Sequence, residues 1–166
     1  MGVMHTTSAN EVLEGGLTEL VGINEALSAS KYSASVGVTI DTSTAGISGE
    51  IVSVALIATE LGSGAILQTA GRLYVFDTDP ATAADAAALA ANGADHKNIV
   101  GSVKIASTDW GADANGGVAY ASVAIPFHQL STLYFVFQPD SGATTINSAV
   151  GDDEELYLNF WYRREK

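Results

Sequence analysis

Hydrophobic and polar residues alternate along much of the chain. In KYSASVGVTI (31–40) every second residue is apolar, beginning with Tyr32 and ending with Ile40. A period of two residues is typical of a half-buried strand. Five further stretches predict strands: EIVSVALIATEL (50–61), GRLYVFDTD (71–79), NIVGSVKIAS (98–107), VAYASVAIPF (118–127) and STLYFVFQP (131–139). In the fourth of these, Pro126 indicates a strand end or a sheet edge, because proline has no N–H for a ladder.

The last stretch, ELYLNFWYR (155–163), is apolar on both faces of the strand that it predicts. Leu156, Leu158, Phe160 and Tyr162 share one face, and Tyr157, Asn159, Trp161 and Arg163 share the other. Four acidic residues, 152–155, overlap its start, and Arg163, Arg164 and Lys166 lie at its end. We therefore expect one face to fill the core and the other to contact a neighbouring protein.

One helix is predicted, in DPATAADAAALAANGAD (79–95). Asp79 can cap it, Pro80 suits its first turn, alanines fill it and Asn92-Gly93 ends it. The segment LTELVGINEAL (17–27) fits a short helix and a strand equally well. Residues 1–16 show no period and end in Gly15-Gly16, which predicts an N-terminal arm.

About seven or eight short strands with one inserted helix predict an all-β fold, an antiparallel β-sandwich or jelly roll spanning residues 17–166. A doubly wound α/β fold would need helices between most strands. The loops DTSTAGISG (41–49) and TDWGADANGG (108–117) are predicted turns.

Composition limits the possible functions. The 166 residues include no cysteine, so thiol catalysis and disulfides are excluded. The formal net charge of -12 opposes direct binding to nucleic acid. No apolar run approaches the length of a membrane span, and residues 1–16 lack a basic region followed by an apolar one, so we expect a protein made in a cytoplasm.

The strongest enzyme motif is LYVFDTDPAT (73–82), which resembles the nucleophile motif of haloacid-dehalogenase-type phosphatases. That resemblance implies a nucleophile at Asp77, an acid and base at Asp79, a phosphate contact at Lys104 and magnesium binding at GDDEE (151–155). The family needs parallel strands covered by helices, which this sequence does not predict. A strand end followed by a helix cap explains the two aspartates, so we expect no enzyme activity.

Metal binding has little support in the sequence. The acidic turns contain oxygen ligands, but none has the spacing of an EF-hand loop. The three histidines, His5, His96 and His128, show no shared-metal spacing. No Gly-x-Ser-x-Gly elbow supports a Ser-His-Asp triad. We expect no cofactor.

Exposed aromatic residues suggest either a sugar-binding face or a protein interface, and the candidates are Trp110, Tyr157, Trp161 and Tyr162. Because the final strand is apolar on both faces, a protein interface is favoured. The expected interface residues are Tyr157, Trp161, Arg163, Arg164 and Trp110.

The stretch from Arg72 to Arg164 resembles small structural proteins of tailed-bacteriophage virions. The similarity is greatest in FDTDPA (76–81), FHQLSTLYFVF (127–137) and GDDEELYLNFWYR (151–163). It implies a place in the virion and no chemistry, with the major capsid protein or other virion proteins as partners. We expect a capsid decoration or cement protein that forms a homotrimer; the alternative is a receptor-binding or carbohydrate-binding module of a head fibre or tail.

Overall fold

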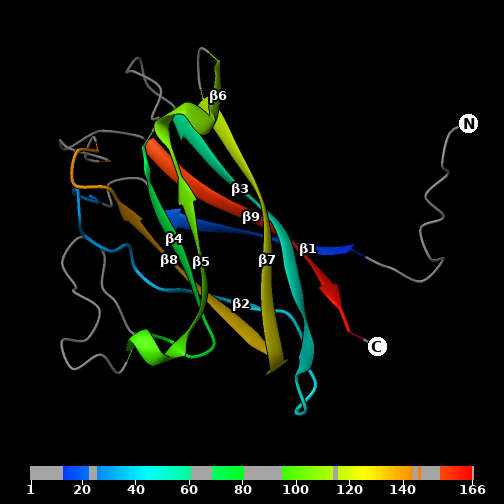
Figure 1. Ribbon diagram of the computed structural model, residues 1–166. Helices are drawn as coiled ribbons and strands as arrows, with labels where there is room; N and C mark the ends of the chain where they lie inside the picture. The colour runs from blue at the N-terminus through cyan, green and yellow to red at the C-terminus, as the bar shows by residue number, and fades with distance from the viewer. Residues whose placement is uncertain are drawn as a thin grey trace, which may run out of the picture.

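The computed structural model describes residues 13–22, 26–60, 69–80, 95–113, 116–143, 146 and 154–165. These ranges contain two short 3-10 helices, η1 (Asp95–Asn98) and η2 (Ser107–Asp109), and the strands shown in Figure 1. The strands are β1 (Leu13–Val21), β2 (Val36–Thr39), β3 (Ile47–Glu60), β4 (Gly71–Phe76), β5 (Ile99–Ile105), β6 (Trp110–Asp113), β7 (Gly116–Leu130), β8 (Thr132–Pro139) and β9 (Glu154–Arg164). No helical segment in the described ranges has the length and apolar character needed to cross a membrane.

The strands form two antiparallel sheets. One has the order β1-β9-β3-β7-β6, and the other has the order β2-β8-β4-β5. The prediction of an antiparallel β-sandwich is confirmed. The helix predicted for 79–95 falls mainly outside the described residues.

The strand β1 corrects two expectations about the N-terminal region. It begins at Leu13, and it settles the open choice for 17–27 in favour of a strand up to Val21. Gly15 and Gly16, which we expected to end an arm, pair with Trp161 and Phe160 of β9. A Cβ atom at Gly16 would lie 2.8 Å from the Phe160 ring, so only glycine leaves room for this ring. The remainder of the predicted arm, residues 1–12, lies outside the described residues.

Two other boundaries differ from the predictions. The strand expected over 31–40 is regular only in β2 (Val36–Thr39). The turn expected over 108–117 contains β6, which forms a hairpin ladder with the start of β7. Pro126 lies inside β7, opposite Glu50 of β3 and beyond the β7 residues that β6 pairs with. It is therefore on a sheet edge, which is one of the two places predicted for it.

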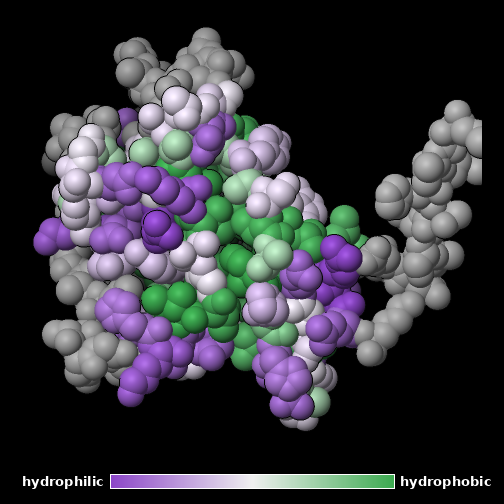
Figure 2. Space-filling view, in the orientation of Figure 1, coloured by the Kyte–Doolittle hydropathy of each residue, from purple (hydrophilic) through white to green (hydrophobic). Residues whose placement is uncertain are grey.

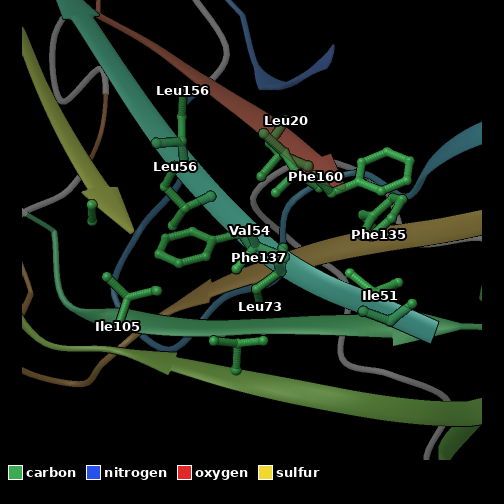
Figure 3. Close-up of a cluster of buried hydrophobic side chains, with 14 of the residues drawn as sticks. Leu20, Ile51, Val54, Leu56, Leu73, Ile105, Phe135, Phe137, Leu156 and Phe160 are labelled. Atoms are coloured by element: carbon green, nitrogen blue, oxygen red, sulfur yellow. The ribbon is translucent and has the colours of Figure 1, made fainter. Parts of the chain in front are cut away.

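The core lies between the two sheets and is dominated by aromatic and branched side chains (Figure 3). Phe135 of β8 and Phe160 of β9 meet across it with ring centroids 4.8 Å apart. Both side chains are fully buried. A buried phenylalanine of this kind typically contributes about 3–5 kcal/mol relative to alanine, so this contact is a main attachment between the sheets.

A β-bulge explains how β3 directs its side chains. The register of β3 shifts between Ile51 and Ser53 against both of its neighbours, and in the pairing with β9 the extra residue lies in β3. Ile51 and Val54 are three residues apart, yet both are fully buried. In an unbroken strand residues three apart point to opposite faces, so the extra residue, Val52, is what lets both reach the core.

One side of the sandwich is closed by contact between β5 and β7, which belong to different sheets. A Cβ atom at Gly101 of β5 would lie 2.6 Å from Cγ2 of Ile125 on β7. Real Cβ atoms do not approach that closely, so only glycine permits this approach of the two strands.

We expect Gly101→Ala to force β5 and β7 apart and to lower the free energy of unfolding by about 1–3 kcal/mol, the usual cost of overpacking. Gly142→Ala is the matched control, because no atom lies within 4 Å of its added Cβ. Chemical denaturation of both variants measures the difference. In the double variant Gly101→Ala with Ile125→Ala the clashing Cγ atoms are absent, so its loss of stability should be smaller than the sum of the two single losses. Equal stability of Gly101→Ala and Gly142→Ala would contradict the close-approach explanation.

Candidate interaction surface

The outer face of the five-stranded sheet is the side that points away from the core. Pairing of β1, β9, β3 and β7 places the following side chains on it: Leu13, Leu17 and Glu19; Tyr157, Asn159, Trp161 and Arg163; Glu50, Ser53, Ala55 and Ile57; and Val118, Tyr120 and Ser122. Of the five expected interface residues, Tyr157, Trp161 and Arg163 lie on it.

This outer face exposes large apolar side chains. Leu13, Leu17 and Tyr120 are 57%, 64% and 67% exposed, and half-buried Ile57 and Trp161 lie between them on the sheet. Figure 2 views the molecule from the side of β5 and β7, where apolar side chains also reach the surface between the two strands. Solvated faces of antiparallel sheets are normally polar, so a face of this composition is typical of a binding surface.

Trp161 extends from β9 across its neighbour β1. A Cβ atom at Gly15 would lie 3.2 Å from Cδ1 of the Trp161 indole. The absence of a side chain at Gly15 therefore lets the indole lie over the β1 backbone. This arrangement puts an aromatic anchor close to the sheet edge.

The two ends of β9 differ in charge on the outer face. At its start the Tyr157 hydroxyl donates to Glu155 over 3.0 Å, and Glu19 lies opposite Tyr157. The hydrogen bond to Glu155, with a contribution from Glu19, raises the pKa of Tyr157 above its usual value. At the other end Arg163 lies opposite Glu50 and Leu13. The outer face is thus acidic at the start of β9, whereas at the other end Arg163 and Glu50 lie opposite each other.

Arg164 has a different role from its neighbour Arg163. Its guanidinium binds both carboxylate oxygens of Glu14, with Nε–Oε1 and Nη2–Oε2 distances of 2.8 Å, and it donates to the Ile40 carbonyl over 3.1 Å. The Tyr162 hydroxyl also donates to Glu14, over 2.7 Å. Burial, together with this bond, raises the pKa of Tyr162. Arg164 therefore ties β9 to β1 and to the end of β2, and it is a structural residue within the monomer.

Trp110 is not available as an interface or sugar-binding residue. Its side chain is only 7% exposed and belongs to the core, and its indole N–H donates to the Thr69 carbonyl over 3.2 Å. The sequence suggested exposure because Trp110 lies in a run of turn residues, but that run forms η2 and β6. Tyr162, a further sugar-binding candidate, is 4% exposed.

A separate hollow of ≈ 360 Å³ lies beside the ends of β4 and β7, lined by Asp77, Val100, Pro126, Phe127, His128, Leu130 and Glu165. Nδ1 of His128 is 2.7 Å from Oγ of Ser48, and that oxygen accepts from the Gln129 N–H. These bonds connect β3 to β7 near their bulged register. Oδ1 of Asp77 is buried and has no hydrogen-bond partner among the described residues.

The residues of the phosphatase motif are not brought together. Asp77 follows the end of β4, whereas Lys104 lies opposite Arg72 at the start of that strand, roughly 16 Å away along it. The Asp79 carboxylate accepts a hydrogen bond from Ser35. Residues 151–153 of the acidic loop lie outside the described residues. Because the strands run antiparallel, the arrangement that the family requires is not present here.

Metal-ligating residues also remain dispersed. Among the described residues, no three His, Asp or Glu side chains are grouped so that they could hold a metal ion. His96 lies in η1 and His128 on β7, and His5 lies outside the described ranges. The Asp41 carboxylate of the first acidic turn accepts from Ser43, and this bond lowers the pKa of Asp41.

Comparisons with known proteins do not show a family for this chain. No family model matches the chain, and no curated protein matches it in sequence. One similar solved structure is dimeric latent PorU from Porphyromonas gingivalis, with 15% identity and a TM-score of 0.39. The match covers 93% of this chain and 13% of the PorU chain.

We expect Arg164→Ala to lower the melting temperature by about 2–4 °C, which corresponds to about 1 kcal/mol in a domain of this size, because it removes a bidentate ion pair. Arg163→Ala, at the adjacent residue on the outer face, should change stability by less than about 0.5 kcal/mol. Thermal unfolding of both variants tests this division. Equal losses of stability in the two variants would show that Arg164 contributes no more to the fold than Arg163 does.

Proposed function

We propose that the protein is a non-enzymatic structural module that attaches to a larger protein assembly through the outer face of its five-stranded sheet. The exposure of Leu13, Leu17 and Tyr120 on one sheet face is the observation that supports this most directly. Trp161 and Tyr157 lie between these residues. Aromatic and arginine side chains dominate the energetics of interfaces, and all are present on this face.

The kind of assembly follows from the sequence resemblance. The regions that resemble tailed-bacteriophage structural proteins include β8 and β9, and β9 supplies Tyr157, Trp161 and Arg163 to the outer face. A decoration or cement protein needs a folded domain and a docking face, without catalytic residues. We therefore propose the surface of a capsid, or another virion protein, as the partner.

We expect Tyr120→Lys to weaken attachment to empty capsids about tenfold or more, because it places a hydrated charge in an apolar contact. Ser141→Lys is the control, since it makes the same charge change at an exposed turn residue. Tyr120 is 67% exposed, so both variants should melt like the parent. Co-sedimentation with capsids measures attachment.

If the two variants attach to capsids equally well, the outer face is not the docking surface. The carbohydrate-binding alternative would be supported if the parent does not attach to capsids but binds a glycan array, and if Trp161→Ala abolishes that glycan binding.

A further inference from the structure

The two sheets have four edges, and three of them are blocked in familiar ways. β2 and β6 contain four residues each. Beyond β6, the free side of β7 contains Pro126. β5 presents Lys104 and packs on β7 at Gly101. Short strands, proline, lysine and covering contacts are the usual protections against pairing with another chain.

The fourth edge, β1, is nine residues long and is less protected, although it contacts β2 near Gly16, where an added Cβ atom would lie 3.3 Å from Cγ1 of Val38. Between Leu13 and Glu19 its side chains alternate between exposed and half-buried, and the next two residues, Leu20 and Val21, are buried. The segment contains no proline, lysine or arginine. In the described part of the chain only β9 pairs with it, so the main-chain N–H and C=O groups on its other side are available for a further strand.

We propose that a second copy of this chain occupies this edge, with the two β1 strands antiparallel and centred on Gly16. This arrangement goes beyond the proposed attachment to an assembly and does not depend on it. A two-fold axis through Gly16 pairs all seven open residues, 13–19, with the same segment of the second copy. It also keeps the two outer faces on the same side of one ten-stranded sheet.

The side chains are complementary in this register. Leu17 would lie opposite Gly15 of the second copy, where the indole of Trp161 covers the β1 backbone. The exposed Leu17 of each copy would thus pack on the edge of the half-buried Trp161 of the other copy.

The charges are compatible with the same register. Glu19 would lie opposite Leu13 of the second copy, and the next residue in that row is Arg163. Glu14, bound by Arg164, would lie opposite Thr18. No two acidic residues face each other, which matters for a chain with a net charge of -12.

A neighbouring register fits less well. A pairing centred on Leu17 would require Val21, which is 2% exposed and is therefore covered within the monomer. The burial of Val21 favours Gly16 over Leu17 as the centre.

Cysteine cross-linking tests the register directly, because the chain has no cysteine of its own. Leu13→Cys and Glu19→Cys, mixed under oxidising conditions with one carrying a mass tag, should give mainly the mixed disulfide, since directly opposed Cα atoms lie about 4.5–5.5 Å apart. Each variant alone places its two cysteines about 20 Å apart and should cross-link poorly. Preferential like-with-like disulfides, or none, would overturn the proposal.

The mass in solution supplies an independent measurement. The parent should be a dimer, and Leu17→Lys should be a folded monomer, because Leu17 is 64% exposed and its replacement leaves the core intact. Tyr120→Lys should remain a dimer, which separates this edge from the proposed docking face. A monomeric parent, a trimer, or a dimeric Leu17→Lys variant would each reject the pairing.

Discussion

The fold depends on the C-terminal strand lying inside a sheet and not at its edge. β9 pairs with β1 on one side and with β3 on the other, and its Phe160 packs against Phe135 of the opposite sheet. The first and last described strands are thus neighbours. Such contacts join distant parts of the sequence, so the five-stranded sheet cannot be completed before the end of the chain is available.

Because β9 is central, its two faces have separate roles. The inner face is fully buried and stabilises the sandwich, whereas the outer face contributes half-exposed aromatic residues and Arg163 to the surface. The binding of Glu14 by Arg164 and Tyr162 secures the end of the strand. A strand anchored on both sides can present Trp161 and Tyr157 in fixed positions, and such preorganisation reduces the entropy lost on binding.

Glycines in β1 and β5 determine where the sandwich is open and where it is closed. At Gly101 the missing Cβ atom lets β5 approach Ile125 and closes one side. At Gly15 and Gly16 the missing Cβ atoms let aromatic rings of β9 lie over β1 on both of its faces. The edge strand β1 therefore lies beside the aromatic side chains of β9, and the outer face extends to the β1 edge.

The alternation of apolar residues was enough to predict an antiparallel sandwich and both faces of β9, because these depend on local side-chain direction. The missing N–H of Pro126 predicted a strand end or a sheet edge, and the structure has the edge. The sequence could not predict the strand order, the bulge at Val52, the burial of Trp110 or the separate roles of Arg163 and Arg164. Each of these depends on which distant strand lies alongside. The sequence predicted that an N-terminal arm ends at Gly15 and Gly16, but both glycines pair with β9, opposite Trp161 and Phe160. Tertiary structure alone placed Leu13, Leu17 and Tyr120 on one face, because only the pairing of β1, β9, β3 and β7 brings them together.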